Sequence, residues 1–146
     1  MDVTALPFNR LIGLEPAAPD SGFLVSLPAD PRYANHLGTV HAVALLAVAE
    51  AGAGAFLAGQ VPDVAGLVPV VRRLEAKFRR PATGRVSARC GVPAEEVARW
   101  LAELDARGRV SASVPVEVLD AGGVVVLSAV VEWFVTRRGR DAVAGA

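Results

Sequence analysis

The stretch from residue 39 to residue 57 constrains the fold more than any other part of the chain. From Ala42 onward, every residue in it is apolar or small except Glu50. A helix that is apolar on all sides is usually buried, so we expect a buried helix here with Thr39 as its N-cap. A carboxylate on such a helix is costly unless it is paired, has a shifted pKa or faces a wet cleft. Glu50 is therefore a candidate functional residue.

The overall composition indicates one globular domain without a strongly charged partner. The 146 residues can bury a core of their own, and 15 basic and 15 acidic residues give a formal net charge of zero. A neutral chain gives no reason to expect nucleic acid as a ligand. No stretch reaches membrane-spanning length without glycine breaks and Glu50, and the N-terminus lacks a basic, apolar leader. We therefore expect a cytoplasmic protein that binds neither membranes nor nucleic acid.

Cysteine and histidine are scarce in the sequence. Cys90 is the single cysteine, which excludes an internal disulfide framework, and His36 and His41 are the two histidines. These residues do not assemble a zinc set, and no phosphate-binding glycine motif or serine elbow is present. We expect no metal and no cofactor, and we interpret Cys90 as a small apolar strand residue. Hydrophobic residues make up 53% of the chain, which favours self-association.

Alternating apolar residues and turn residues predict six antiparallel strands in a single domain over residues 1–146. The predicted strands are 12–15, 22–27, 67–80, 85–92, 109–119 and 124–136. A short helix or arm at 2–10 precedes them, and a helix from Pro93 to Gly108 interrupts the last four. We expect a core over about 10–136 and a flexible tail at 137–146. One long apolar helix with six strands implies an α+β fold in which the sheet wraps the helix.

The pattern Asn35-x-x-Gly38-x-x-His41-Ala42, followed by Leu46-x-x-Ala49-Glu50-x-x-x-Gly54, resembles the hotdog acyl-CoA thioesterases. It is most similar to the PaaI-like group and to a nearby group of hotdog domains. The later segment Arg79-Arg80-Pro81-Ala82-Thr83-Gly84 is similar to their strand-turn segment. The resemblance spans about residues 10–136 and implies the hotdog fold, a long central helix wrapped by an antiparallel sheet. In those families Gly-Gly follows the histidine, whereas Ala42-Val43 stands here.

Hydrolysis of a thioester needs stabilisation of the carbonyl oxygen and either an activated water or an attacking carboxylate. A helix N-terminus offers unpaired N–H groups and a partial positive charge, and Gly38 allows a tight turn before it. We therefore expect the backbone N–H groups from Gly38 to His41, through Thr39 and Val40, to bind the substrate oxygen. Glu50 is then the general base or nucleophile. Asn35 would orient the water or carbonyl, and His41 would donate to the thioester oxygen or hold the loop.

The spacing of His41 and Glu50 predicts how such a site is assembled. Nine residues of helix place them about 13 Å apart along the axis and on nearly opposite faces, so they cannot meet on one substrate atom within one chain. The resemblance implies the same arrangement, because hotdog thioesterases build their sites at a dimer interface. We expect an obligate dimer with two sites, or a dimer of dimers.

Coenzyme A carries phosphates, so a basic rim is expected around an acyl-CoA site. The available residues are seven arginines, of which the first four follow one another along the chain: Arg72, Arg73, Arg79, Arg80, Arg137, Arg138 and Arg140. Arg72, Arg79 and Arg80 are the candidates for substrate binding. Arg72 lies on the otherwise apolar face of its predicted strand, so it needs a partner there or an opening. The arginines equally fit a solvated face.

Other readings of the same residues stay open at this point. Glu50 could mark a partly exposed part of the helix, Asn35 could be a turn residue, and the protein could bind an acyl ligand without catalysis. A hydratase would need an aspartate and a histidine about five residues apart, and Asp30 and His36 miss that spacing by one. An open tunnel at Glu50 favours hydrolysis, whereas an ion pair at Glu50 favours the non-catalytic reading. Medium-chain and aromatic acyl groups fit the apolar composition equally well.

Overall fold

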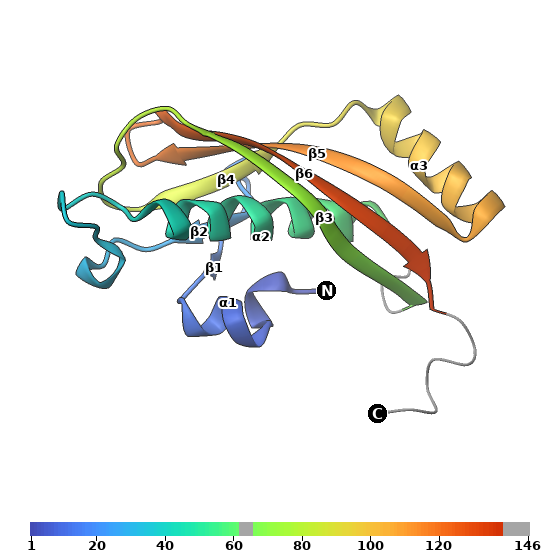
Figure 1. Cartoon of the computed structure of the whole chain (residues 1–146), viewed down its shortest axis with the longest axis horizontal. Helices are drawn as coiled ribbons and strands as arrows, with labels where there is room; N and C mark the ends of the chain where they lie inside the picture. The colour runs from blue at the N-terminus through green and yellow to red at the C-terminus, as the bar shows by residue number, and fades with distance from the viewer. Residues whose placement is uncertain (62–65, 139–146) are drawn as a thin grey trace.

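A long helix wrapped by an antiparallel sheet forms the body of the molecule (Figure 1). The computed structural model describes residues 1–61 and 66–138. The helical elements are η1 (Val3–Ala5), α1 (Pro7–Leu11), η2 (Pro31–Tyr33), α2 (Ala42–Gln60) and α3 (Ala94–Arg107). The strands are β1 (Glu15–Pro16), β2 (Val25–Leu27), β3 (Leu67–Phe78), β4 (Val86–Cys90), β5 (Arg109–Asp120) and β6 (Val125–Arg137). The predicted α+β class and the central helix are confirmed.

The six strands form one sheet in the order β1-β2-β4-β5-β6-β3, with antiparallel pairing throughout. The long strands β3, β5 and β6 arch over one side of α2, and η1 and α1 lie on its other side (Figure 1). The predicted hairpin turn joins β5 to β6, where the Asp120 carboxylate accepts from the N–H groups of Gly122 and Val124 at 2.9 Å each. The order leaves β3 at one edge of the sheet.

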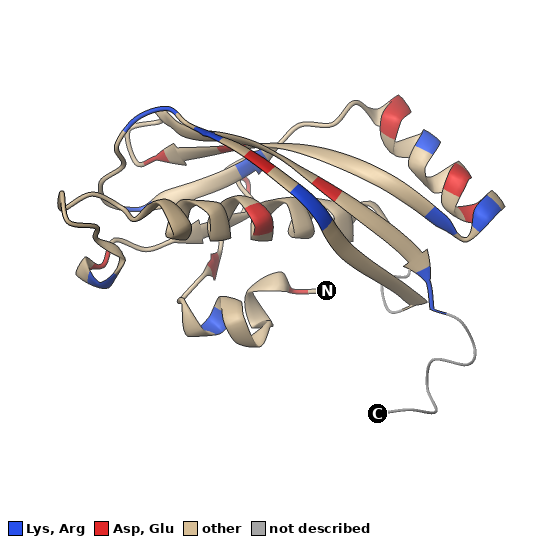
Figure 2. Cartoon of the chain, viewed as in Figure 1, with Lys and Arg blue, Asp and Glu red and all other residues tan. Residues whose placement is uncertain are grey.

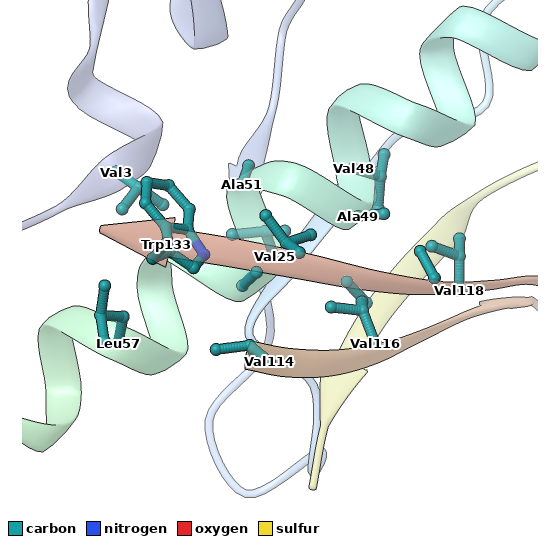
Figure 3. Close-up of a cluster of buried hydrophobic side chains, with 14 of the residues drawn as sticks. Val3, Val25, Val48, Ala49, Ala51, Leu57, Val114, Val116, Val118 and Trp133 are labelled. Atoms are coloured by element: carbon teal, nitrogen blue, oxygen red, sulfur yellow. The ribbon is translucent and has the colours of Figure 1, made fainter. Parts of the chain in front are cut away.

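The core lies between α2 and the concave face of the sheet. Every second residue of β5 is buried, as the alternation predicts: Val110, Ala112, Val114, Val116 and Val118. Figure 3 shows several of these valines against small side chains of α2. At Gly52 the helix comes so close to β4 that an added Cβ would lie 2.6 Å from the Cβ of Ala88. The small residues of α2 therefore fix its distance from the sheet.

The N-cap of α2 is His41, so the prediction of Thr39 as N-cap is wrong. The His41 Nδ1 accepts from the Val43 N–H at 3.1 Å, and the helix begins at Ala42. The chain stays extended up to that point because the Val40 N–H donates to the Ala82 carbonyl at 2.8 Å. This tertiary bond moves the helix start past Thr39.

Strand β3 does not keep the clean alternation predicted for it. The register shifts between Val71 and Arg73, so Arg72 forms a β-bulge. Val70 and Phe78 share the predicted apolar face with Arg72, and both are exposed in the structure. Arg72 does have a partner on that strand pair, since its guanidinium stacks over the Phe134 ring at 5.2 Å.

Both ends of the domain differ from the prediction in detail. The strand predicted at 12–15 is reduced to β1 because α1 runs to Leu11 and the chain turns at Gly13, whose φ is +74°. Arg137 belongs to β6 rather than to the predicted tail, and the Arg138 N–H donates to the Gly66 carbonyl. The rest of the predicted tail, including Arg140, lies outside the described residues.

The close contact of α2 with β4 leads to a stability prediction. We expect Gly52→Ala to lower the free energy of unfolding by about 1–3 kcal/mol, because the new methyl group overpacks the core against Ala88. Gly59→Ala in the same helix is the matched control, since a Cβ there meets no atom within 4 Å. It should leave stability unchanged or raise it by up to about 1 kcal/mol. Urea unfolding of both variants tests this, and equal effects would contradict it.

Candidate functional site

Glu50 lies half-buried near the middle of α2 and is the acidic residue that interrupts this helix in Figure 2. Its side chain lines a cavity of about 490 Å³ between α2, the strands β3 and β6, and the N-terminal segment. The other lining residues are Met1, Val3, Leu6, Asn9, Ala51, Gly54, Leu57, Ala58, Val61, Leu67, Pro69, Val70, Val71, Trp133 and Val135. The carboxylate therefore faces an open and mostly apolar space.

Burial alone raises the pKa of Glu50 above its ordinary value. Within the described residues, no hydrogen bond or ion pair holds its carboxylate. A carboxylate in such surroundings binds a proton more readily than an exposed one, as a general base requires. The ion pair that would have favoured a purely structural role is absent from the described part of the chain.

Asn35 shapes the loop before α2. Its Oδ1 accepts from the N–H groups of Leu37 at 2.9 Å and Thr39 at 3.2 Å, and its Nδ2 donates to the Thr39 Oγ1 at 2.9 Å. Gly38 has a φ of +74°, a left-handed conformation that glycine adopts without strain. The side chain of Asn35 thus builds the turn, and all its bonds here stay inside the loop.

The backbone donors available at the start of α2 differ from those predicted. The N–H groups of Gly38, Thr39, Val40 and His41 donate to the Asn35 carbonyl, the Asn35 side chain, the Ala82 carbonyl and the Tyr33 carbonyl, respectively. The N–H groups of Ala42 and Ala44, in the first turn, meet no acceptor among the described residues. The free donors therefore begin one residue after the predicted segment.

His41 is exposed and has one ring nitrogen committed to capping. Because Nδ1 accepts from the Val43 N–H, the proton of the neutral ring is on Nε2, which is free to donate. His41 lines a cavity of about 210 Å³ with Phe8, Tyr33 and the first turns of α2. Gly38, Thr39 and Val40 line another, of about 270 Å³. Within one chain these residues and Glu50 thus lie at separate cavities.

The candidate arginines lie on β3 and on the turn that follows it, where Figure 2 shows a run of basic residues. Arg72 stacks over Phe134, the Arg79 Nε donates to the Ser128 Oγ at 3.1 Å, and Arg80 is exposed. None of the three lines the cavity of Glu50. The structure does not bring them together with the carboxylate in one chain.

Cys90 does not provide a second nucleophile. Burial raises the pKa of its thiol to about 12, so the thiol stays protonated at neutral pH. Across residues 1–61 and 66–138, no group of three His, Cys, Asp or Glu side chains could hold a metal ion.

The N-terminal segment, residues 1–13, is the part of the cavity that sequence reasoning missed. It places Val3 and Asn9 in the interior, at 4% and 5% exposure. The available signal was the Asp2-x-Thr4 pair, because the Asp2 carboxylate caps η1 through the Thr4 N–H. The wall residue Trp133 was also missed, since strand alternation assigns it to the core without indicating a cavity.

Comparisons with known proteins agree with the fold. A family model described as a domain of unknown function, DUF4442, matches residues 14–135, and no curated protein sequence matches the chain. A Pseudomonas aeruginosa protein of unknown function, described as a probable thioesterase, is 25% identical, with a TM-score of 0.78 over 93% of this chain and 91% of its own.

Two further solved structures share the fold at lower identity. A thioesterase of Haemophilus influenzae is 18% identical, with a TM-score of 0.68 over 92% of this chain and 86% of its own. A Bacillus halodurans protein solved with CoA is 22% identical, with a TM-score of 0.67 over 88% of this chain and 74% of its own. The resemblance to the hotdog thioesterase superfamily is confirmed. Although α2 has the length and hydropathy of a membrane span, it is the core helix of this fold.

The raised pKa of Glu50 predicts how stability depends on pH. The folded state holds the Glu50 proton more tightly than the unfolded chain does, so ionisation of Glu50 lowers stability as pH rises through the raised pKa. We expect Glu50→Gln to melt at a higher temperature than wild type at pH 7. The difference should shrink as pH falls below the ordinary value of 4.5.

Thermal unfolding from acidic to neutral pH measures this effect. Glu95→Gln is the control, because Glu95 is an exposed helical carboxylate. If Glu50→Gln instead melts at a lower temperature than wild type at pH 7, the ionised carboxylate has a stabilising partner and the prediction is wrong.

Proposed function

The chain belongs to the DUF4442 family, and from its hotdog fold and the setting of Glu50 we propose that it is an acyl-CoA thioesterase. The observation that carries this proposal is an unpaired, half-buried carboxylate with a raised pKa at the wall of an apolar cavity. In the proposed reaction, ionised Glu50 takes a proton from the water that attacks the thioester carbonyl. The tetrahedral intermediate then loses the thiolate of coenzyme A by cleavage of the C–S bond, and protonated Glu50 returns the proton to this thiolate. In the variant mechanism Glu50 attacks the carbonyl directly, the thiolate leaves, and water hydrolyses the resulting anhydride.

We propose that the oxyanion is held at the N-terminus of α2. The free N–H groups of Ala42 and Ala44 point out of the first helical turn, where the helix dipole also favours negative charge. The His41 Nε2 adds a side-chain donor beside them. Asn35 and Gly38 act by building the loop that presents this end, and the backbone of Thr39 and Val40 lines the approach to it.

If Glu50 and His41 both act on one substrate, their separation along α2 means that each site takes them from two protomers. The edge strand β3 supports a dimer, because its twelve residues expose Val68, Val70 and Phe78 and an unpaired backbone edge. Natural proteins cover or blunt such edges. We propose that β3 pairs with its counterpart around a two-fold axis, giving a dimer with two equivalent sites, or a dimer of dimers.

Coenzyme A enters this proposal as part of the substrate, and no separate cofactor is needed. Arg72, Arg79 and Arg80 lie along β3 and its turn and form no ion pair with the described residues, so their charges are available to the phosphates of coenzyme A. The similar fold of the CoA-bound Bacillus halodurans protein supports this ligand class. A cytoplasmic location fits an acyl-CoA substrate.

Free-thiol release from a panel of acyl-CoAs tests the activity. We expect turnover by the wild type and a loss of about 10²-fold or more in Glu50→Gln, the usual size for a catalytic acid–base group. The wild-type kcat should rise with pH through the raised pKa of Glu50, because the base must be ionised. Glu95→Gln should retain full activity. Absence of turnover on every substrate would instead favour a protein that binds acyl ligands without hydrolysing them.

A proline substitution tests the oxyanion donor without disturbing the helix. Proline is tolerated at the first position of a helix, and His41 already has the extended conformation that a following proline favours, with φ −62° and ψ 140°. We expect Ala42→Pro to fold normally and to lose about 10²–10³-fold in kcat, as when an oxyanion donor is removed. Ala94→Pro, at the start of α3, is the matched control and should stay active.

Mixing two inactive variants tests the shared site. If Glu50 and Ala42 of one site come from different protomers, a mixed dimer of Glu50→Gln with Ala42→Pro contains one intact site. Refolding the two together should restore about a quarter of the wild-type rate by random pairing. No recovery in a mixture shown to contain mixed dimers would place both residues in the same protomer's site.

A further inference from the structure

The cavity at Glu50 is elongated along α2. Six of its lining residues follow one side of the helix, Glu50, Ala51, Gly54, Leu57, Ala58 and Val61. The eleven residue steps from Glu50 to Val61, the C-cap of α2, cover about 16 Å along the helix axis. The opposite wall consists of β3 and β6, and the N-terminal segment provides the third side. The cavity is therefore a groove that begins at Glu50 and runs toward the C-terminal end of α2.

Apart from Glu50, the groove offers almost no polar group to a ligand. Asn9 is one other polar side chain in the lining, and its Nδ2 already donates to the Val3 carbonyl at 2.9 Å. The indole N–H of Trp133 is the other polar group, and it is buried without a partner among the described residues. The volume of about 490 Å³ lies in the range of small-molecule sites. An apolar groove with one carboxylate at its end suits a ligand with a reactive head and an aliphatic tail.

The N-terminal segment, residues 1–13, is folded and covers one side of this groove. The Asp2 carboxylate accepts from both the Thr4 N–H and the Thr4 hydroxyl, and the Leu14 N–H donates to the Asn9 carbonyl at 2.9 Å. These bonds hold Val3 against the groove. Figure 3 shows Val3 beside the ring of Trp133.

Gly54 lies one helical turn beyond Glu50, where α2 is close to both the N-terminal segment and strand β6. An added Cβ at Gly54 would lie 3.5 Å from the ring of Trp133 and 3.8 Å from the side chain of Val3. These are ordinary contact distances, so the position tolerates alanine but has no spare width. Gly54 therefore marks a constriction of the groove between Glu50 and Ala58, where a side chain would take up the remaining width.

We propose that this groove binds the acyl tail of the thioester and selects unbranched aliphatic chains of medium length. The thioester carbonyl lies at Glu50, and the tail passes Gly54 between Val3 and Trp133 and continues toward Ala58 and Val61. A short acyl group leaves the far part of the groove empty. A branched or bulky one meets the narrow passage at Gly54. This assignment rests on the proposed thioesterase activity for the position of the carbonyl.

Two substitutions along the groove test both its use and its direction. Ala58→Leu fills the far part of the groove and should weaken the binding of decanoyl-CoA about tenfold or more, because added carbon atoms in a pocket change the discrimination between substrates by at least that factor. The affinity for butanoyl-CoA should stay unchanged. Gly54→Ala narrows the groove at residue 54 and should weaken the binding of decanoyl-CoA several-fold. Gly59→Leu is the control, because position 59 is exposed and a Cβ there meets no atom within 4 Å.

Affinities are measured by calorimetry in the Glu50→Gln background, which separates binding from turnover, and kcat/KM is measured with Glu50 present. Chain-length-dependent binding that Ala58→Leu abolishes, without any hydrolysis by the wild type, would support the groove and overturn the thioesterase. If Ala58→Leu and Gly59→Leu hydrolyse acyl-CoAs with the same chain-length profile, the groove is not the acyl site, whereas the thioesterase proposal is supported. If decanoyl-CoA does not bind Glu50→Gln, the groove is also not an acyl site. This result is expected if a second copy of the chain occupies the groove instead.

Discussion

The contact between the small-residue face of α2 and the sheet is the constraint on which the rest of the structure depends. At Gly52 the helix backbone lies against Ala88 with no room for a side chain. This contact sets how closely α2 packs against the sheet at β4. The cavity at Glu50 lies further along, where α2, the strands β3 and β6 and the N-terminal segment form its three sides.

Regular patterns predicted the body of the fold. The apolar run at 42–60 indicated a buried helix, and the alternation in β5 and the turn at Asp120 indicated the long hairpin. These features are local, because each follows from the spacing of residues within one element. The candidate residue Glu50 was found in the same way, as the one charge in an apolar helix.

Features that depend on distant contacts could not be predicted. The start of α2 is set by a hydrogen bond from Val40 to Ala82, and the bulge at Arg72 belongs to an edge strand whose edge position is not encoded in its own pattern. The same holds for the proposed oxyanion donors. Spacing located them near the helix start, but which N–H groups stay free depends on acceptors at Tyr33, Asn35 and Ala82. The groove required both Val3 and Trp133, which are far apart in sequence.

The N-terminal segment is held by its own short-range bonds and lies before residue 14, where the family-matched region begins. The carboxylate and the helix N-terminus both lie inside that region. The groups of the proposed reaction therefore lie in the family-matched region, and one wall of the proposed acyl groove lies in a separate, locally folded segment. Under that proposal, changes among the first thirteen residues would alter the size of ligand that the groove accepts, while the core packing and the reacting groups stay as they are.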